Sequence, residues 1–281
     1  MAEITNAIIM DLRARTNAGM MDCKRALAET NGDMEAAIKI LRLKGLAIQV
    51  KRADKEANQG IVQAAASADG SVKALVEVNS ETDFVAKTDG FKAFVDAVAA
   101  RVLAGDENVA GSLKDELVAI VSTTGENIRI RRTARFARTG NAVIESYIHM
   151  GGKVGVLVEL TCGKAASAAD PAVAGLAHDI ALQIAAAAPR WLDQTQVPSE
   201  IVESEKALYR QDPKLAGKPD KIVENALTGK LRKFYGDVCL VNQVFVKDDK
   251  LTVTQVVEAT AKACGDKIAI RRFARFQLGA A

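Results

Sequence analysis

Apolar residues recur at helical spacing in the first part of the chain. Ile8 and Leu12 are four residues apart, and Met20, Cys23 and Leu27 lie at positions i, i+3 and i+7. This spacing places apolar side chains along one face of a helix. The pattern therefore predicts two short helices.

A third helix is predicted over Met34–Leu43. Asp33 is suited to cap its start, and Gly45 is expected to end it. The charged stretch 51–56 is poor in apolar residues and is expected to be a linker. Residues 1–54 are thus predicted to form a separate three-helix bundle.

The rest of the chain contains an internal repeat. Ala74–Asn79 matches Val156–Thr161 at an offset of 82 residues, and Ile128–Phe136 matches Ile268–Phe276 at an offset of 140. Chance explains poorly an agreement that extends over strand, turn and helix positions. Two related subdomains are therefore expected.

Both repeats predict the same elements. Strand-like runs at 61–66 and 72–78 are joined by Asp69-Gly70, which is typical of a hairpin turn, and Met150–Gly152 forms the turn in the second copy. Helices are then expected at 113–121 and 256–263, and strands at 128–135 and 268–275. Each repeat is predicted to be a small antiparallel sheet backed by helices.

The predicted fold class is therefore α+β, with core subdomains at 55–140 and 141–281. The offset grows from 82 to 140, so the second copy contains 58 extra residues. Their apolar residues have helical spacing, as in the pair Ile201 and Leu208. We expect a projecting, coiled-coil-like helical hairpin at about 190–240. The alternative is a helical pair packed flat on the body.

Composition narrows the functional class. The 38 Lys and Arg residues against 35 Asp and Glu give a net charge of +3, which does not indicate a nucleic-acid binder. The N-terminus resembles no signal peptide, and no apolar run is long enough for a membrane span. Four scattered cysteines then indicate reduced thiols in a cytoplasmic protein.

Signatures of catalysis and cofactor binding are missing. The two histidines, His149 and His178, have no cysteine at metal-binding spacing, and Asp248-Asp249 lacks the other ligands of a calcium loop. The glycines near Lys153 do not form a phosphate-binding loop, because the repeat places them in a hairpin turn. No catalytic residue, metal, cofactor or bound nucleotide is expected.

Two arginine-rich strands leave an alternative open. The runs at 128–136 and 268–276 could bind RNA or the ribosome as a basic patch. Their period-two alternation instead favours strands that turn arginines to solvent and Ile130 or Ile270 inward. No aromatic stacking motif of the RNA-binding type accompanies them.

The pattern of apolar residues does not explain the position of Phe84. This residue lies in the polar junction Asn79–Lys87, where a strand ends and a helix begins, and it has no periodic apolar neighbours. Thr82 or Ser80 could cap that helix. Phe84 could tuck under the helix, or it could be an aromatic anchor for a partner protein.

Two longer segments resemble the elongation factor Ts family. Thr16–Leu27 is similar to the family's signature near the N-terminus, and Glu77–Lys87 is similar to its second signature. Similarity continues to Ile270–Phe276 and so covers essentially the whole chain. Asn17 departs from the usual glycine, and the chain stops soon after Phe276.

The resemblance implies a fold and a function. The fold would be a ubiquitin-associated-like domain followed by two related subdomains, the second with a helical coiled-coil hairpin. The activity would be guanine nucleotide exchange on the GTPase elongation factor Tu, without nucleic acid or membrane. The resemblance leaves a 2:2 assembly with the GTPase open.

The resemblance also implies contact residues. The second signature would enter the GTPase near its magnesium and nucleotide, through Thr82, Asp83, Phe84 and Val85. Further contacts would come from Arg13, Met20, Met21 and His149. Core packing is the competing interpretation for one of the two methionines, because adjacent helical residues cannot share a face.

Overall fold

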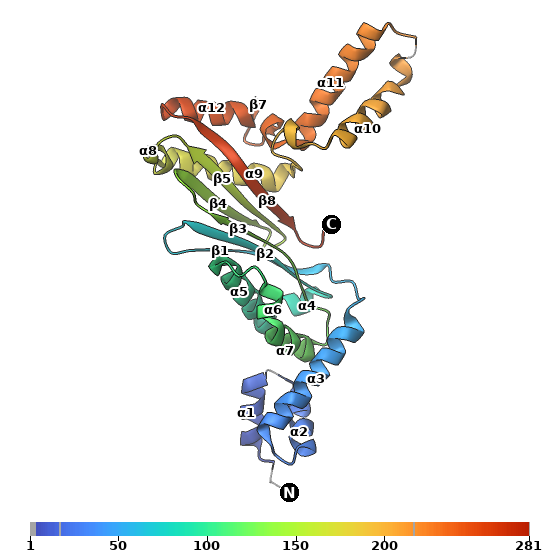
Figure 1. The fold of residues 1–281 in the computed structure, drawn as a ribbon, viewed down its shortest axis with the longest axis vertical. Helices are drawn as coiled ribbons and strands as arrows, with labels where there is room; N and C mark the ends of the chain where they lie inside the picture. The colour runs from blue at the N-terminus through green and yellow to red at the C-terminus, as the bar shows by residue number, and fades with distance from the viewer. Residues whose placement is uncertain (1–3, 17, 216, 281) are drawn as a thin grey trace. The chain divides into compact units, whose positions relative to one another are not determined.

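The computed structural model describes residues 4–16, 18–215 and 217–280 (Figure 1). Asn17, noted above as a departure from the family pattern, lies outside them. The chain divides into two compact units. Unit 1 runs to Arg135 and includes Ile148–Gly155 and the segment from Phe276 onward, and unit 2 consists of Phe136–Tyr147 and Val156–Arg275.

Unit 1 begins with the three predicted helices. They are α1 (Asn6–Thr16), α2 (Met20–Glu29) and α3 (Met34–Arg52). Asp33 caps α3 as expected, since its carboxylate accepts the Ala36 N–H at 3.0 Å. The buried cluster among the helices includes Ile9, Leu12, Cys23, Leu27 and Leu41.

Two sequence predictions about α3 are wrong. The helix does not end at Gly45 but continues to Arg52, so the first residues of the expected linker are helical. Gly45 is buried against α7 (Lys114–Thr124), where an added Cβ would lie 2.7 Å from Val118 Cγ1. The glycine therefore permits close helix packing, and it does not terminate the helix.

The rest of unit 1 is built on the sheet β1-β2-β3. Its strands are β1 (Gln59–Ala66), β2 (Val72–Ser80) and β3 (Arg129–Ala137). β1 and β2 are antiparallel, with Gln59 opposite Ser80. Its helices are α4 (Asp83–Ala86), α5 (Asp89–Ala104), α6 (Val109–Ser112) and α7. The apolar side of α5, including Phe91 and Val98, packs into the same buried cluster as Val76 and Val78 of β2.

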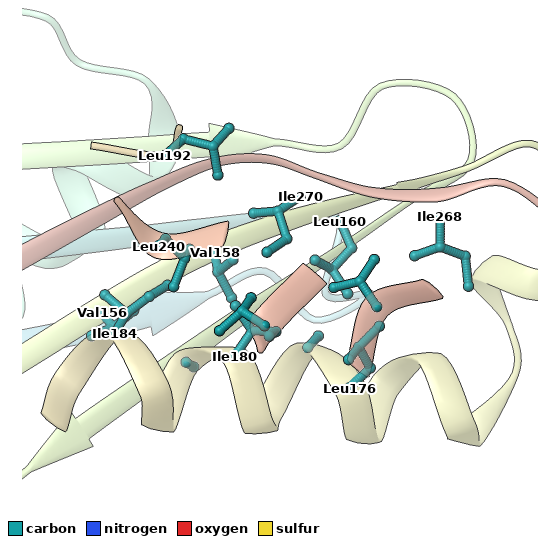
Figure 2. Close-up of a cluster of buried hydrophobic side chains, with 14 of the residues drawn as sticks. Val156, Val158, Leu160, Leu176, Ile180, Ile184, Leu192, Leu240, Ile268 and Ile270 are labelled. Carbon is teal, nitrogen blue, oxygen red and sulfur yellow. The ribbon is translucent and has the colours of Figure 1, made fainter. Parts of the chain in front are cut away.

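Unit 2 repeats this plan on the sheet β4-β5-β8 (Figure 1). Its strands are β4 (Ala142–His149), β5 (Val154–Cys162) and β8 (Ile268–Gln277). Its matching helices are α8 (Ala165–Ala168), α9 (Pro171–Ala187) and α12 (Val253–Ala263). Figure 2 shows Leu176, Ile180 and Ile184 of α9 turned toward the strand residues Val156 and Val158. The predicted α+β class, with small antiparallel sheets, is confirmed.

The extra residues of the second copy contain two helices, and a small hairpin follows them. The helices are α10 (Ser199–Arg210) and α11 (Asp220–Val238), and the strands are β6 (Val244–Phe245) and β7 (Asp248–Thr252). Figure 1 shows α10 and α11 side by side, extending away from the β4-β5-β8 sheet. At their base, the Trp191 N–H donates to the Val238 carbonyl at 3.1 Å. The pair is therefore not packed flat against the β4-β5-β8 sheet.

The face that α10 turns to α11 differs from the predicted one. Leu208 is 59% exposed. The adjacent Tyr209 is half-buried, and Lys230 Nζ of α11 lies 5.4 Å from the centroid of its ring. Lys230 also forms an ion pair with Asp212 at 2.5 Å. The contact between the helices is thus partly polar, which a pattern of apolar spacing does not reveal.

Candidate protein-interaction site

A short helix begins where β2 ends. Thr82 has an extended backbone and caps α4, because its Oγ1 accepts the Val85 N–H at 3.4 Å. The Ser80 hydroxyl donates to the Thr82 carbonyl at 2.8 Å and fixes the preceding turn. Thr82, of the two predicted candidates, is the cap. Hydrogen bonds therefore fix both the backbone of Thr82 and the start of α4.

The two sides of α4 have opposite environments. Ala86 is buried, and Val85 packs against the apolar cluster of unit 1. Phe84 is 77% exposed, although a phenylalanine on a protein surface usually finds cover. Of the two interpretations left open for Phe84, the one in which the ring tucks under the helix is therefore wrong. An aromatic side chain on a fixed turn, open to solvent, suits the anchor of a protein interface.

Asp83 and Lys87 flank the exposed ring. Their side chains form an ion pair at 2.6 Å, and Lys87 Nζ lies 5.8 Å from the centroid of the Phe84 ring. The hydrogen bond from Lys87 lowers the pKa of Asp83, and the positive charges of Lys87 and Lys153 act in the same direction. Asp83 is therefore a carboxylate at neutral pH.

Two glutamates that the sequence analysis missed hold this segment. Glu126 accepts the Thr82 N–H at 3.0 Å and the Thr82 hydroxyl at 2.6 Å. Glu81 accepts the Asn127 N–H at 2.7 Å and pairs with Arg52 at 2.9 Å. The neighbouring Gly125 also matches Gly265 at the offset of 140 residues, but this match does not indicate the role of Glu126.

The turn between β4 and β5 belongs to the same unit as Phe84. His149, the last residue of β4, is exposed, and Met150 is 64% exposed with a φ of 50°. Lys153 of this turn is near enough to Asp83 to lower the pKa of its carboxyl. The positive charge of this turn thus acts on Asp83 in the same direction as that of Lys87.

Arg13, Met20 and Met21 lie on the three-helix part of unit 1. Met20 and Met21 are 48% and 65% exposed, and Arg13 is exposed on α1. The core-packing interpretation of one methionine is wrong, because the buried face of α2 consists of Cys23, Ala26 and Leu27. All three side chains are therefore open to solvent, and they lie on different elements from Phe84.

A cavity of about 930 Å³ lies beside Arg13. Arg15, Arg42 and Lys114 also line it, together with the acidic Asp115 and Glu116 and apolar residues of α5 and α7. None of the residues 82–85 reaches this cavity. The exposed ring of Phe84 is therefore a separate surface feature.

Few groups in the described residues offer metal or thiol chemistry. In residues 4–16, 18–215 and 217–280, no three His, Cys, Asp or Glu side chains are arranged to hold a metal ion. The four cysteines are free, and burial raises the pKa of Cys239 to about 11. Within the same residues, no helix is long and apolar enough to cross a membrane.

The predicted alternation holds for most of the arginine-rich strands, where the exposed arginines are Arg129, Arg131, Arg135 and Arg271. Arg132 and Arg272 are only partly exposed. Arg132 Nε donates to Glu77 at 2.6 Å, and Arg272 Nε donates to Glu159 at 2.5 Å. Both glutamates are completely buried. These two arginines serve the fold, because each compensates a buried carboxylate.

Comparison with known proteins places this arrangement in a family. The family model described as Elongation factor TS matches residues 81–280, which include α4 and the β4–β5 turn. The chain belongs to the elongation factor Ts family.

Relatives named elongation factor Ts extend over almost the whole chain. The protein from Trichlorobacter lovleyi is 47% identical over 98% of this chain and 93% of its own length. The protein from Desulfovibrio desulfuricans is 42% identical over the full length of both chains. The protein from Clostridium botulinum strain Eklund 17B is 41% identical over 96% of this chain and 91% of its own. The resemblance to elongation factor Ts inferred from the two signatures is confirmed.

Proposed function

We propose that this chain is the guanine nucleotide exchange factor of the GTPase elongation factor Tu in translation elongation. The observation that carries the proposal is Phe84, 77% exposed on a short helix whose start is capped by Thr82. It lies within the segment that matches the elongation factor Ts family. The rigid support means that little conformational entropy is lost when the ring is buried by a partner.

The proposed mechanism acts on the magnesium and phosphate site of the GTPase. In such enzymes magnesium bridges protein oxygens and nucleotide phosphates and neutralises their charge. Insertion of Asp83 and Phe84 beside that site would displace the ion or its ligands, so the affinity for GDP would fall. Because linkage is reciprocal, bound GDP must weaken the binding of this chain by the same factor.

The neighbouring residues have supporting roles in this proposal. Thr82 caps the helix, and Val85 anchors it to the core of unit 1. Arg13, Met20, Met21 and His149 would supply further contacts to the GTPase. Exchange makes and breaks no covalent bond, so the chain would need no catalytic residue, cofactor, bound nucleotide or nucleic acid.

The finer assignments of the fold belong to the same proposal. Residues 1–54 would be a ubiquitin-associated-like domain, and 55–140 and 141–281 would be the two core subdomains. The pair α10 and α11, near 190–240, would be the family's coiled-coil hairpin. A 2:2 assembly with the GTPase would appear as a doubled mass in light scattering of the mixture.

Binding to RNA or the ribosome is less well supported. Arg132 and Arg272, central in the two basic strands, are engaged with buried carboxylates. An arginine held in this way contributes little to a phosphate-binding surface, because moving it would leave its glutamate unpaired.

The decisive experiment measures the release of fluorescent GDP from elongation factor Tu of Trichlorobacter lovleyi. We expect the chain to accelerate release in proportion to its concentration until the GTPase is saturated. Phe84→Ala is the matched variant, and its effect is considered in the Discussion. An unchanged release rate at saturating concentrations of the unmodified chain would overturn the proposed function.

A further inference from the structure

We propose that Glu126 is a positioning residue that holds α4 so that Phe84 projects toward the partner. This inference rests on the proposed function, since Phe84 is the group that Glu126 acts through. The Glu126 carboxylate accepts two hydrogen bonds from Thr82, one from the N–H at 3.0 Å and one from the hydroxyl at 2.6 Å. Hydrogen bonds to a charged acceptor are stronger than those between neutral groups.

The bond to the hydroxyl determines how Thr82 can cap the helix. A threonine hydroxyl has one proton to donate and lone pairs that accept. Glu126 takes the proton, which turns a lone pair of Oγ1 toward the Val85 N–H. Without Glu126 the hydroxyl is free to rotate, and the N-terminal end of α4 loses its fixed direction.

A second pair of contacts makes the attachment reciprocal. Glu126 accepts the N–H of Thr82, while Glu81 accepts the N–H of Asn127 at 2.7 Å. Glu81 and Thr82, which follow β2, are thus bonded to Asn127 and Glu126, which precede β3. Asn127 is buried. The Arg52 guanidinium also donates a hydrogen bond to the Glu81 carboxylate at 2.9 Å. The segment that precedes α4 and Phe84 is therefore held by hydrogen bonds in both directions.

The second repeat contains the same backbone contact without the aromatic residue. Asp266 accepts the Lys164 N–H at 2.8 Å, and Lys164 directly precedes α8 as Thr82 precedes α4. Lys164 has no hydroxyl to cap the helix, and the residue of α8 that matches Phe84 is Ala166. The carboxylate contact thus belongs to the repeated fold, and only the first copy uses it to present a large apolar side chain.

This repetition supplies a matched control. Glu126→Ala and Asp266→Ala remove equivalent carboxylates, but only the first should alter Phe84. We expect Glu126→Ala to reduce the maximal rate of GDP release about three- to tenfold, because partly exposed hydrogen bonds to a charged group contribute modestly. Asp266→Ala should leave that rate unchanged. Equal losses in the two variants would contradict the inference.

A double-mutant cycle separates positioning from general stability. If Glu126 acts through Phe84, Glu126→Ala should have no further effect in a chain that already carries Phe84→Ala. A structural role alone would give the same reduction in both backgrounds, and that result would overturn the inference. Glu126→Gln, which keeps one acceptor oxygen, should give an intermediate rate and serves if the alanine variant does not fold.

Amide hydrogen exchange tests the inference on the chain alone. Glu126→Ala should speed exchange at the Thr82 amide and leave the amides of α5 unchanged. If the unmodified chain fails to release GDP, the proposed function fails, but faster exchange at Thr82 still supports the positioning role. Unchanged exchange at Thr82 would overturn that role whatever the GTPase assay shows.

Discussion

Glu77 and Glu159 occupy equivalent positions in the two repeats, and neither side chain is exposed. Arg132 compensates the first and Arg272 the second, at 2.6 and 2.5 Å. Glu77 also accepts the Gly279 N–H at 2.9 Å, and Glu159 also pairs with Arg271 at 3.2 Å. A carboxylate is tolerated in an apolar interior only with such partners.

The same two arginines also lie over aromatic rings. The guanidinium of Arg132 is 4.9 Å from the ring centroid of Phe276, and that of Arg272 is 4.1 Å from the ring centroid of Phe136. Phe276 belongs to unit 1 although it lies near the end of β8, and Phe136 belongs to unit 2 although it lies near the end of β3. Each unit thus contains one copy of a glutamate, arginine and phenylalanine arrangement.

We predict that Glu77→Ala destabilises the chain by about 3 kcal/mol, near the lower end for breaking a buried ion pair. The estimate is at the lower end because the side chain of Arg132 is 29% exposed and can be partly hydrated. Denaturant unfolding measures the change. The exposed Glu107→Ala is the control and should change little. Equal stability of the two variants would show that water compensates Arg132.

We predict that Phe84→Ala weakens binding to the GTPase by about 1–3 kcal/mol, the range of many interface anchors. The stability of the free chain should barely change, because the ring is 77% exposed. Phe91→Ala provides the contrast, since Phe91 is fully buried and its loss should cost about 3–5 kcal/mol of folding free energy. Binding and unfolding are measured separately. Full exchange activity in Phe84→Ala would rule out its role as an anchor.

We predict that both units fold after removal of residues 199–234 and insertion of a short Gly-Ser bridge. The first repeat lacks this insertion, and Trp191 remains bonded to Val238 at the base. The deletion spares Val197 and Leu240, which are buried. A cooperative thermal transition should remain, whereas Leu240→Ala, as a core control, should lower the transition temperature. Aggregation of the shortened chain would show that α10 and α11 are needed for folding.

We predict that Asp69, in the β1–β2 turn, titrates at about pH 2. Its carboxylate accepts hydrogen bonds from the Ser67 hydroxyl at 2.7 Å and from the N–H and hydroxyl of Ser71, and these lower its pKa from 3.8 to about 2. Because the folded pKa is depressed, ionised Asp69 stabilises the folded turn above about pH 4. That contribution is lost as the pH falls through about 2.

A carbon-detected NMR titration measures the pKa of Asp69. Ser67→Ala should raise the midpoint toward 3.8, since it removes the main cause of the shift. Ser67→Thr keeps the hydroxyl and should preserve the low value. A midpoint that does not respond to Ser67→Ala would mean that the bonds from Ser71 are sufficient.

The sequence by itself determined the repeated plan of the chain. The match of Ala74–Asn79 with Val156–Thr161 placed β2 and β5, and the change of offset located α10 and α11. These signals survive in sequence because strand alternation, helical spacing and turn glycines depend on residues close together in the chain. The second family signature is also a run of neighbouring residues, and it pointed to Phe84.

Only the tertiary structure decided the roles of residues whose partners are distant in the chain. Glu126 bonds Thr82 across 44 residues, and Arg132 bonds Glu77 across 55. Gly45 has the sequence signal of a helix end, yet its contact with Val118 makes it a packing position inside α3. Periodicity cannot encode such contacts, because the energy of burying a charge or approaching another helix depends on which surfaces the completed fold brings together.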